Sequence, residues 1–247
     1  IQTHIRVDFA LLAMNQIVNL AAKYKYMSGG RLEVPMLIRM VIGRSWGQGA
    51  QHSQSLQSLF AHIPGLTVIM PASAESIRDC YPYIVSKHRG PVIAIEHRLM
   101  YDLAFRFGGE APQRHNASPL SSRLVRPGTD ITIVATSIMV LEALRAADHL
   151  AEVSDIDCEI IDLNCVSHID GAMILDSVKK TGRLMVADTS WRSYGVCAEI
   201  CRTVSENSPS ALKAPVVTLG MQPAPCPTGK TLEDLFYPNL EIMVNAI

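Results

Sequence analysis

The spacing of apolar residues along the chain predicts helices and buried strands in alternation. Between residues 7 and 24 apolar side chains recur every three or four positions, which predicts one amphipathic helix that ends before Gly29 and Gly30. Further runs and periodic segments predict strands at 35–42, 66–70 and 91–96 and helices at 54–62 and 74–87. Strands that alternate with helices indicate a parallel sheet covered by helices.

A second set of alternating elements follows a break in this pattern. Between residues 100 and 130 the periodicity is lost, and glycines, prolines and scattered charges indicate an extended connection. Beyond it we expect strand 130–136, helix 139–153, strand 158–163, helix 170–180, strand 183–187, helix 196–205 and strand 215–219. The chain is therefore predicted to form two α/β domains, 1–108 and 129–247, joined by a linker at 109–128.

Composition and charge exclude several classes of protein. The chain of 247 residues has 22 Lys and Arg against 23 Asp and Glu, so it lacks the positive excess that favours nucleic acid. No stretch approaches the ~18 consecutive apolar residues of a transmembrane helix. Charged residues make up 18 % of the chain, below the roughly 25 % usual in globular domains. We therefore expect no nucleic acid partner and no membrane, but a surface partly covered by another chain.

The cysteines indicate a reducing compartment. None of the six forms a C-x-x-C pair, and although Cys197 and Cys201 lie one helical turn apart, no second pair completes a metal site. A chain of this size does not need disulfides, so we expect reduced thiols and a cytoplasmic or mitochondrial matrix location. The sequence begins at Ile1 without the pattern of a signal peptide.

The stretch from 45 to 74 is the most unusual, because it contains no Asp, Glu, Lys or Arg. Its many amides and hydroxyls are typical of a segment buried against a cofactor or a partner chain. Gly47 and Gly49 leave room for the backbone to approach a ligand. His52 falls where this loop is expected to enter a helix, and it is a candidate for proton transfer. The simpler alternative is a histidine that only hydrogen-bonds the backbone, and for His62 we expect only a packed or interfacial role.

The sequence contains no complete nucleotide-binding or hydrolase motif of the common kinds. The sequence Gly229-Lys230-Thr231 resembles the end of a phosphate-binding loop, but Ala224 stands where that loop requires glycine. The prolines before it favour a rigid turn that precedes a helix near Thr231. Neither G-x-G-x-x-G after a strand nor G-x-S-x-G nor H-E-x-x-H occurs.

Five strings, taken in order, carry a family resemblance. They are AAKYKYMSGG at 21–30, GAQHSQS at 49–55, AHIPGL at 61–66, LMY at 99–101 and YGVCAEI at 194–200. Together they resemble the beta subunit of the thiamine-diphosphate-dependent decarboxylating component of 2-oxo acid dehydrogenase complexes. The strings span nearly the whole chain, which makes the set more specific than any single motif.

This resemblance implies a fold and a function. The fold would be α/β, with two three-layer parallel-sheet domains: a transketolase-type pyrimidine-binding domain, N-terminally incomplete here, and a transketolase C-terminal domain. The function would be oxidative decarboxylation of a 2-oxo acid with acyl transfer to a lipoyl group. Two alternatives remain open, a split transketolase or carboligase subunit with the same cofactor and a catalytically incomplete scaffold subunit.

The resemblance also implies partners and cofactors. In the family an alpha subunit holds the diphosphate and magnesium of thiamine diphosphate through a Gly-Asp-Gly motif, which this chain lacks. The expected assembly is an alpha2beta2 heterotetramer, active only with its alpha partner, that passes the acyl group to a lipoyl-bearing acyltransferase.

Individual residues correspond to family positions. Phe9 matches the aromatic residue that packs on the aminopyrimidine, and His52 matches the active-site histidine. Met36 and Val85 lie where backbone carbonyls hold a monovalent cation such as potassium in some members, although the stretch 73–90 is one residue longer here. The glutamate that sets the cofactor's tautomer in the family lies upstream of the part that matches this sequence.

Overall fold

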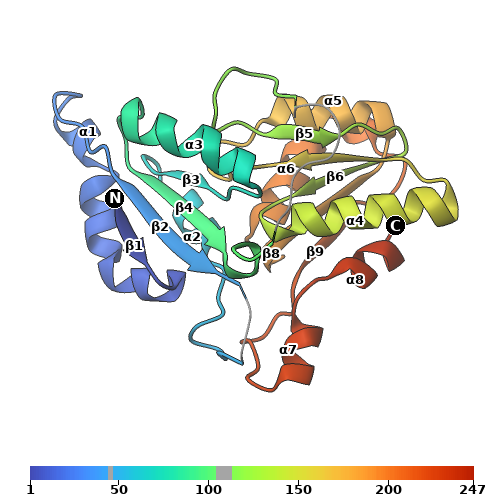
Figure 1. Cartoon of the computed structure of the whole chain (residues 1–247). Coiled ribbons are helices and arrows are strands. Elements are labelled where there is room, and N and C mark those ends of the chain that lie inside the picture. Colours follow the sequence, from blue (N-terminus) through green and yellow to red (C-terminus); the bar gives the residue numbers. More distant parts are fainter. Residues whose placement is uncertain (44–46, 104–112) are drawn as a thin grey trace.

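The computed structural model describes residues 1–43, 47–103 and 113–247, which form two α/β units side by side (Figure 1). Within these ranges the N-terminal unit has a four-stranded parallel sheet in the order β1-β2-β4-β3. Its strands are β1 (Gln2–His4), β2 (Leu37–Ile42), β3 (Thr67–Ile69) and β4 (Val92–His97). Its helices are η1 (Val7–Ala13), η2 (Asn15–Ala21), α1 (Tyr24–Met27), α2 (Gln57–Ala61), α3 (Ala74–Ser86) and η3 (Arg98–Met100).

The described part of the C-terminal unit contains a five-stranded sheet in the order β5-β7-β6-β8-β9. Its strands are β5 (Arg123–Arg126), β6 (Ile131–Ala135), β7 (Cys158–Asp162), β8 (Leu184–Trp191) and β9 (Val217–Met221). Its helices are α4 (Ile138–Ser154), α5 (Gly171–Thr181), α6 (Val196–Asn207), η4 (Pro209–Ala211), α7 (Lys230–Phe236) and α8 (Leu240–Asn245). The strands pair in parallel except β5, which runs antiparallel to β7.

Each unit has three layers because its central strands are apolar on both faces. In β2 and β4, alternate residues pack either on η1, η2 and α2 or on α3. In β6, Val134 belongs to the core beneath α5 and α6, whereas Ile133 faces α4. The core that contains Val134 continues into the N-terminal unit through Val68 and Phe60, so the two units share one apolar interior.

The structure corrects the expected helix over 7–24. That stretch is a 3₁₀ segment (η1), a π-helical segment (η2) and the short α1. Both ends are fixed by the chain that follows, since Asp8 accepts hydrogen bonds from Gln54 and the Lys23 ammonium donates to the Pro64 carbonyl at 2.6 Å. Short 3₁₀ and π segments occur at the ends of helices and within them, and the spacing of apolar residues does not separate them from one continuous α-helix.

Three further expectations differ from the structure. The helix expected at 54–62 begins only at Gln57, because the carbonyls of Ser53 and Ser55 accept hydrogen bonds from the C-terminal unit instead of from helical N–H groups. The strand β1 is not predicted by the pattern. Strand β5 lies inside the expected connection 100–130, and the linker expected at 109–128 falls partly on residues 104–112, outside the described ranges.

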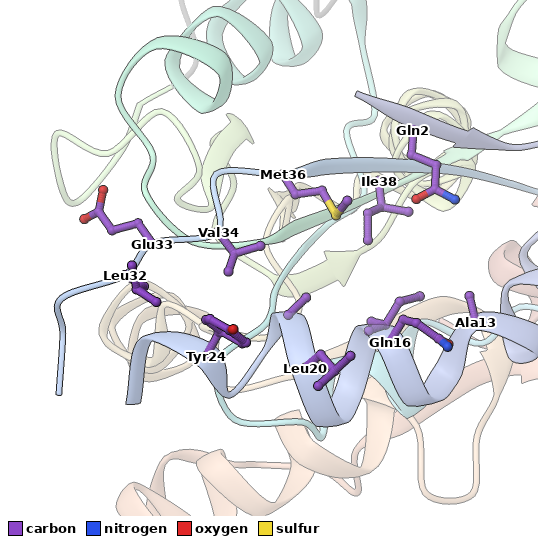
Figure 2. Close-up of a pocket in the computed structure, with 12 residues that line it drawn as sticks. Gln2, Ala13, Gln16, Leu20, Tyr24, Leu32, Glu33, Val34, Met36 and Ile38 are labelled. Carbon is purple, nitrogen blue, oxygen red and sulfur yellow. The ribbon is translucent and has the colours of Figure 1, made fainter. Parts of the chain in front are cut away.

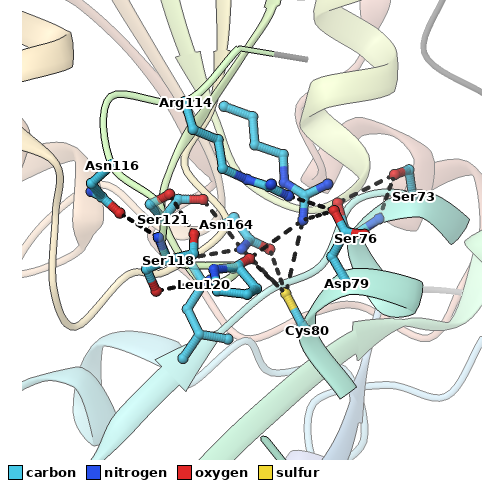
Figure 3. A network of polar contacts seen from close by, with 12 residues as sticks. Ser73, Ser76, Asp79, Cys80, Arg114, Asn116, Ser118, Leu120, Ser121 and Asn164 are labelled. Atoms are coloured by element: carbon cyan, nitrogen blue, oxygen red, sulfur yellow. Dashed lines mark hydrogen bonds and ion pairs between the residues drawn. The ribbon is translucent and has the colours of Figure 1, made fainter. Parts of the chain in front are cut away.

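A polar network joins α3 to the C-terminal unit (Figure 3). Arg123 of β5 is 1 % exposed, and its guanidinium lies 3.5 Å from the Asp79 carboxylate of α3. Asn164 Nδ2 donates to the Leu120 carbonyl at 2.9 Å, while its backbone N–H donates to Asp162 at 3.0 Å. Buried charges are costly unless paired, so this network fixes one relative position of the two units.

Asp162 makes the stability of the chain depend on pH. Burial raises the pKa of this fully buried carboxyl group from 3.8 to about 6, although the charge of Arg123 lowers it. The unfolded chain loses this proton near pH 4, whereas the folded chain keeps it until about pH 6. The free energy of unfolding therefore falls by about 3 kcal/mol as the pH rises through this window.

We expect Asp162→Asn to remove this dependence, because an amide keeps an acceptor for Asn164 but cannot ionise. Denaturant unfolding of both proteins from pH 4 to pH 7.5 measures it. The variant should gain stability relative to the wild type as the pH rises over this range, by about 2.5 kcal/mol in total. A difference that stays constant over this range would contradict the assignment.

Candidate active site

The structure brings Phe9 and His52 together. The centroids of the two rings lie 5.2 Å apart with an interplanar angle of 69°, an edge-to-face arrangement. Phe9 extends from η1 and is 48 % exposed, and His52 is half-buried in the turn that follows Gly49. His52 therefore does not stand at a helix entrance as expected, since α2 begins five residues later.

Two side chains from the start of η1 fix the loop that carries His52. The Asp8 carboxylate accepts hydrogen bonds from the Gln54 side chain at 2.9 Å and from its backbone N–H at 3.3 Å. The Arg6 guanidinium donates to the Gly43 carbonyl at 2.7 Å. Burial lowers the pKa of Arg6, while the nearby charge of Asp8 raises it. The strand end before the loop and the segment after His52 are thus both attached to the η1 turn.

The glycine loop lies against the C-terminal unit. In Figure 1 the light-blue loop after β2 runs beside the red segment that precedes α7. Gly47 and Gly49 have φ angles of +62° and +70°, and a Cβ on Gly47 would lie 2.5 Å from the Thr228 carbonyl oxygen. Glycine is needed here for both backbone angle and space. Residues 44–46 lie outside the described ranges.

The uncharged segment is covered mainly by the other unit of the same chain. The Tyr237 hydroxyl donates to the Ser53 carbonyl at 3.2 Å, and the Ser190 hydroxyl donates to the Ser55 carbonyl at 2.7 Å. Gln57 donates to the Asp188 carboxylate at 2.8 Å. The expectation of a cofactor or partner chain is therefore incomplete, because these carbonyls and amides meet their own C-terminal unit.

Asp188 is fully buried in this contact, as is Gln57. Thr136 and the backbone N–H of Thr189 also donate to the oxygen that Gln57 uses. Burial raises the pKa of Asp188, although the hydrogen bonds from Thr136 and Gln57 lower it. In the sequence it stands out only as a single acid inside the otherwise uncharged strand β8.

Several buried atoms of the segment keep no partner. Within the described part of the chain, a buried side-chain atom without a hydrogen bond occurs in each of Gln48, Ser53, Ser55, Gln57 and Ser58. Arg6 Nη2 and Asp8 Oδ2 are also buried without a hydrogen-bond partner. Buried polar atoms normally find partners, so the unpaired atoms of Arg6 and Asp8, which adjoin Phe9 in the chain, indicate a place for a polar ligand.

A second polar cluster fixes the turn after β4. Glu96 accepts a bidentate pair of hydrogen bonds from Arg39, at 2.8 and 2.7 Å, and further ones from the hydroxyls of Tyr101 and Tyr81. Burial raises the pKa of Glu96, but these donors outweigh it and hold the pKa below its usual value. The cluster holds Tyr101 of the string at 99–101 in place.

The remaining predicted residues are placed elsewhere. The Met36 carbonyl accepts the Val92 N–H, and the Met36 side chain points into an apolar pocket of about 530 Å³ between β2 and η2 (Figure 2). Val85 is exposed in the last turn of α3, so a cation site at Met36 and Val85 stays a prediction. His62 is exposed at the end of α2 rather than packed, and it lines a groove toward α6.

Other features of the described residues bear on metals and membranes. No group of three or more His, Cys, Asp and Glu side chains in those residues could hold a metal ion. The six cysteines, all within the described ranges, are free thiols. Among the described helices, none combines the length and apolar character needed to cross a bilayer.

Comparison with known proteins places these observations in a family. Residues 3–103 match the transketolase pyrimidine binding domain, and residues 121–243 match the transketolase C-terminal domain. The chain is 35 % identical to the pyruvate dehydrogenase E1 component subunit beta of Rickettsia conorii, over 97 % of this chain and 72 % of that protein. The chain belongs to the E1 beta family. The predicted resemblance is thereby confirmed.

Other members of the E1 beta family show a similar relation. Identity is 39 % to the mitochondrial pyruvate dehydrogenase E1 component subunit beta-1 of Arabidopsis thaliana, over 97 % of this chain and 66 % of that protein. It is 38 % to the beta subunit of acetoin:2,6-dichlorophenolindophenol oxidoreductase of Cupriavidus necator, over 94 % of this chain and 68 % of that protein. The chain thus spans about two thirds of the length of these relatives.

The E1 beta chain also resembles a solved structure, described as a split gene transketolase in an inactive beta4 tetramer. The TM-score is 0.74 at 23 % sequence identity, over 99 % of this chain and 73 % of that one. This likeness confirms the predicted fold of two parallel-sheet α/β domains.

The glycine loop generates a testable prediction. We expect Gly47→Ala to lower the free energy of unfolding by about 2 kcal/mol or more, because alanine disfavours a positive φ and its Cβ would meet the Thr228 carbonyl. Gly229→Ala is the matched control, since Gly229 has a φ of −70° and a Cβ there would have no described atom within 4 Å. Urea unfolding compares the two, and equal stabilities would contradict the described contact.

Proposed function

We propose that this chain is the beta subunit of a thiamine-diphosphate-dependent 2-oxo acid dehydrogenase. In this role it takes part in the oxidative decarboxylation of a 2-oxo acid and in acyl transfer to a lipoyl group. The observation that carries the proposal is the Phe9–His52 pair, in which an exposed aromatic ring and an imidazole lie 5.2 Å apart in a member of the E1 beta family. The names of the relatives, pyruvate dehydrogenase and acetoin oxidoreductase, support the same class of chemistry.

The residues present fit the heterocycle of such a cofactor. Phe9 offers an exposed aromatic ring, and its neighbours in the chain, Arg6 and Asp8, keep an unpartnered buried donor and an unpartnered buried acceptor. An aromatic surface with a few polar groups is typical of cofactor sites. When bound, thiamine diphosphate supplies a carbon nucleophile and accepts the electron pair that carbon dioxide leaves behind.

The chain's own residues would bind, orient and transfer protons. Phe9 packs against the ring of the cofactor and fixes its plane. A nitrogen of the His52 imidazole gives a proton to the carbonyl oxygen of the 2-oxo acid and takes one up again when the acyl group leaves for the lipoyl group. The covered segment from Ser53 to Gln57 excludes water from this side of the site.

The partners and domains follow the same proposal. An alpha subunit would hold the diphosphate and magnesium in an alpha2beta2 heterotetramer, and a lipoyl-bearing acyltransferase would receive the acyl group. The pyrimidine-binding domain would extend over 1–108, the linker over 109–128 and the C-terminal domain over 129–247, with potassium near Met36 and Val85. The free thiols support a reducing compartment, the cytoplasm or the mitochondrial matrix.

Reconstitution with an alpha subunit, magnesium, thiamine diphosphate and a lipoyl domain tests this function. We expect 2-oxo-acid-dependent acylation of the lipoyl domain, and we expect His52→Asn to lower its rate by on the order of 100-fold because the proton donor is lost. His149→Asn, an exposed position on α4, is the matched control and should leave the rate unchanged.

Three outcomes would contradict the proposal. Undiminished acylation by His52→Asn would remove this residue from the mechanism. A carbon–carbon product formed with aldehydes in place of acylation would favour the carboligase alternative. Equal activity of the alpha subunit with and without this chain would favour the scaffold alternative.

A further inference from the structure

The two oxygens of the Asp8 carboxylate have different surroundings: one accepts two hydrogen bonds and the other accepts none. Asp8 is 8 % exposed, and its Oδ1 accepts both the backbone N–H and the side-chain amide of Gln54. In the described part of the chain its Oδ2 is buried without a hydrogen bond. Burying a carboxylate oxygen without a hydrogen bond costs free energy, so Asp8 is expected to have a role at this position.

Asp8 connects the two segments that carry Phe9 and His52. It directly precedes Phe9 in η1, and Gln54 follows His52 by two residues. Its two hydrogen bonds therefore join the short segment that carries one ring to the short segment that carries the other. The backbone of the His52 turn itself is held by a longer hydrogen bond, from the His52 N–H to the Gly49 carbonyl at 3.4 Å.

The positive charge of the nearby Arg6 stabilises the buried Asp8 carboxylate. Arg6 is also buried, its guanidinium donates to the Gly43 carbonyl, and Asp8 and Arg6 attract each other through their charges. The same turn of η1 thus holds the beginning of the loop through Arg6 and the segment after His52 through Asp8. Both attachments position the loop and neither involves the ring of His52.

We propose that Asp8 is a positioning residue, which sets the His52 imidazole against Phe9 through its two hydrogen bonds to Gln54. As a contribution to catalysis this rests on the proposed function, whereas the geometry it sets does not. The acceptor at this position fixes where the segment after His52 lies, and a misplacement of about 1 Å in an active site can cost about 100-fold in rate.

The first test measures the ring pair without any catalysis. In the chain labelled with ¹³C-histidine, the resonance of His52 is identified by its loss in His52→Asn, and the ring current of Phe9 shifts it. We expect Asp8→Ala to move this resonance toward its position in Phe9→Leu. Asp8→Asn keeps an acceptor for Gln54 and should leave most of the shift, as should the exposed control Asp148→Ala.

The second test uses the enzyme reconstituted with its alpha subunit. We expect Asp8→Ala to lower kcat by about 10-fold to 100-fold with the KM for the 2-oxo acid within about 3-fold, and Asp8→Asn to restore most of kcat. Gln54→Ala combined with Asp8→Ala should lower kcat little further, since both variants remove the same contact. Urea unfolding confirms that each variant is folded at the assay temperature.

The outcomes separate this proposal from the proposed function. A His52 resonance that Asp8→Ala leaves in place would overturn the positioning role, whatever the enzyme catalyses. Equal losses of kcat in Asp8→Ala and Asp8→Asn would also overturn it, because the charge and not the acceptor would then matter. A resonance that moves as expected in a chain without dehydrogenase activity would leave the positioning role intact and reject only the proposed function.

Discussion

The contact between residues 53–57 and the C-terminal unit is the constraint on which the candidate site depends. Here the backbone gives up helical hydrogen bonds, and its carbonyls accept those of Tyr237 and Ser190 instead. The buried hydrogen bond from Gln57 to Asp188 is part of the same contact. Because the segment cannot move without leaving these groups unpaired, the turn that carries His52 is held in front of η1. The C-terminal unit therefore supports the candidate site, whose two rings, Phe9 and His52, both come from the N-terminal unit.

The fold could be predicted in most of its elements from the sequence. Central strands such as β2 and β4 are continuous apolar runs, and long helices such as α4 have a clear period, so burial alone specifies them. The elements that differ are set by tertiary contacts instead. Asp8 and Lys23 attach the stretch that contains η1 and η2 to later parts of the chain, and β5 is stabilised by its pairing with β7. Neither cause leaves a local pattern in the sequence.

The candidate site could be predicted in part. The absence of charge between residues 45 and 74 indicates the segment that carries His52, and the family resemblance indicates Phe9 and His52 themselves. The residues that position them were missed, because Asp8 is an ordinary acid in sequence and Asp188 lies 131 residues from its partner Gln57. The cover of the segment was misjudged for the same reason, since a contact between distant segments of one chain looks, in sequence, like a contact with another molecule.

Binding of thiamine diphosphate tests most directly the claim that this chain supplies one side of a shared site. Titration calorimetry with magnesium present would compare this chain alone, the alpha subunit alone and the mixture of the two. The account predicts tight binding only in the mixture, and binding weakened about 10-fold or more by Phe9→Ala, because the aromatic surface under the heterocycle is lost. Binding by the alpha subunit alone that equals binding by the mixture, and that Phe9→Ala leaves unchanged, would contradict it.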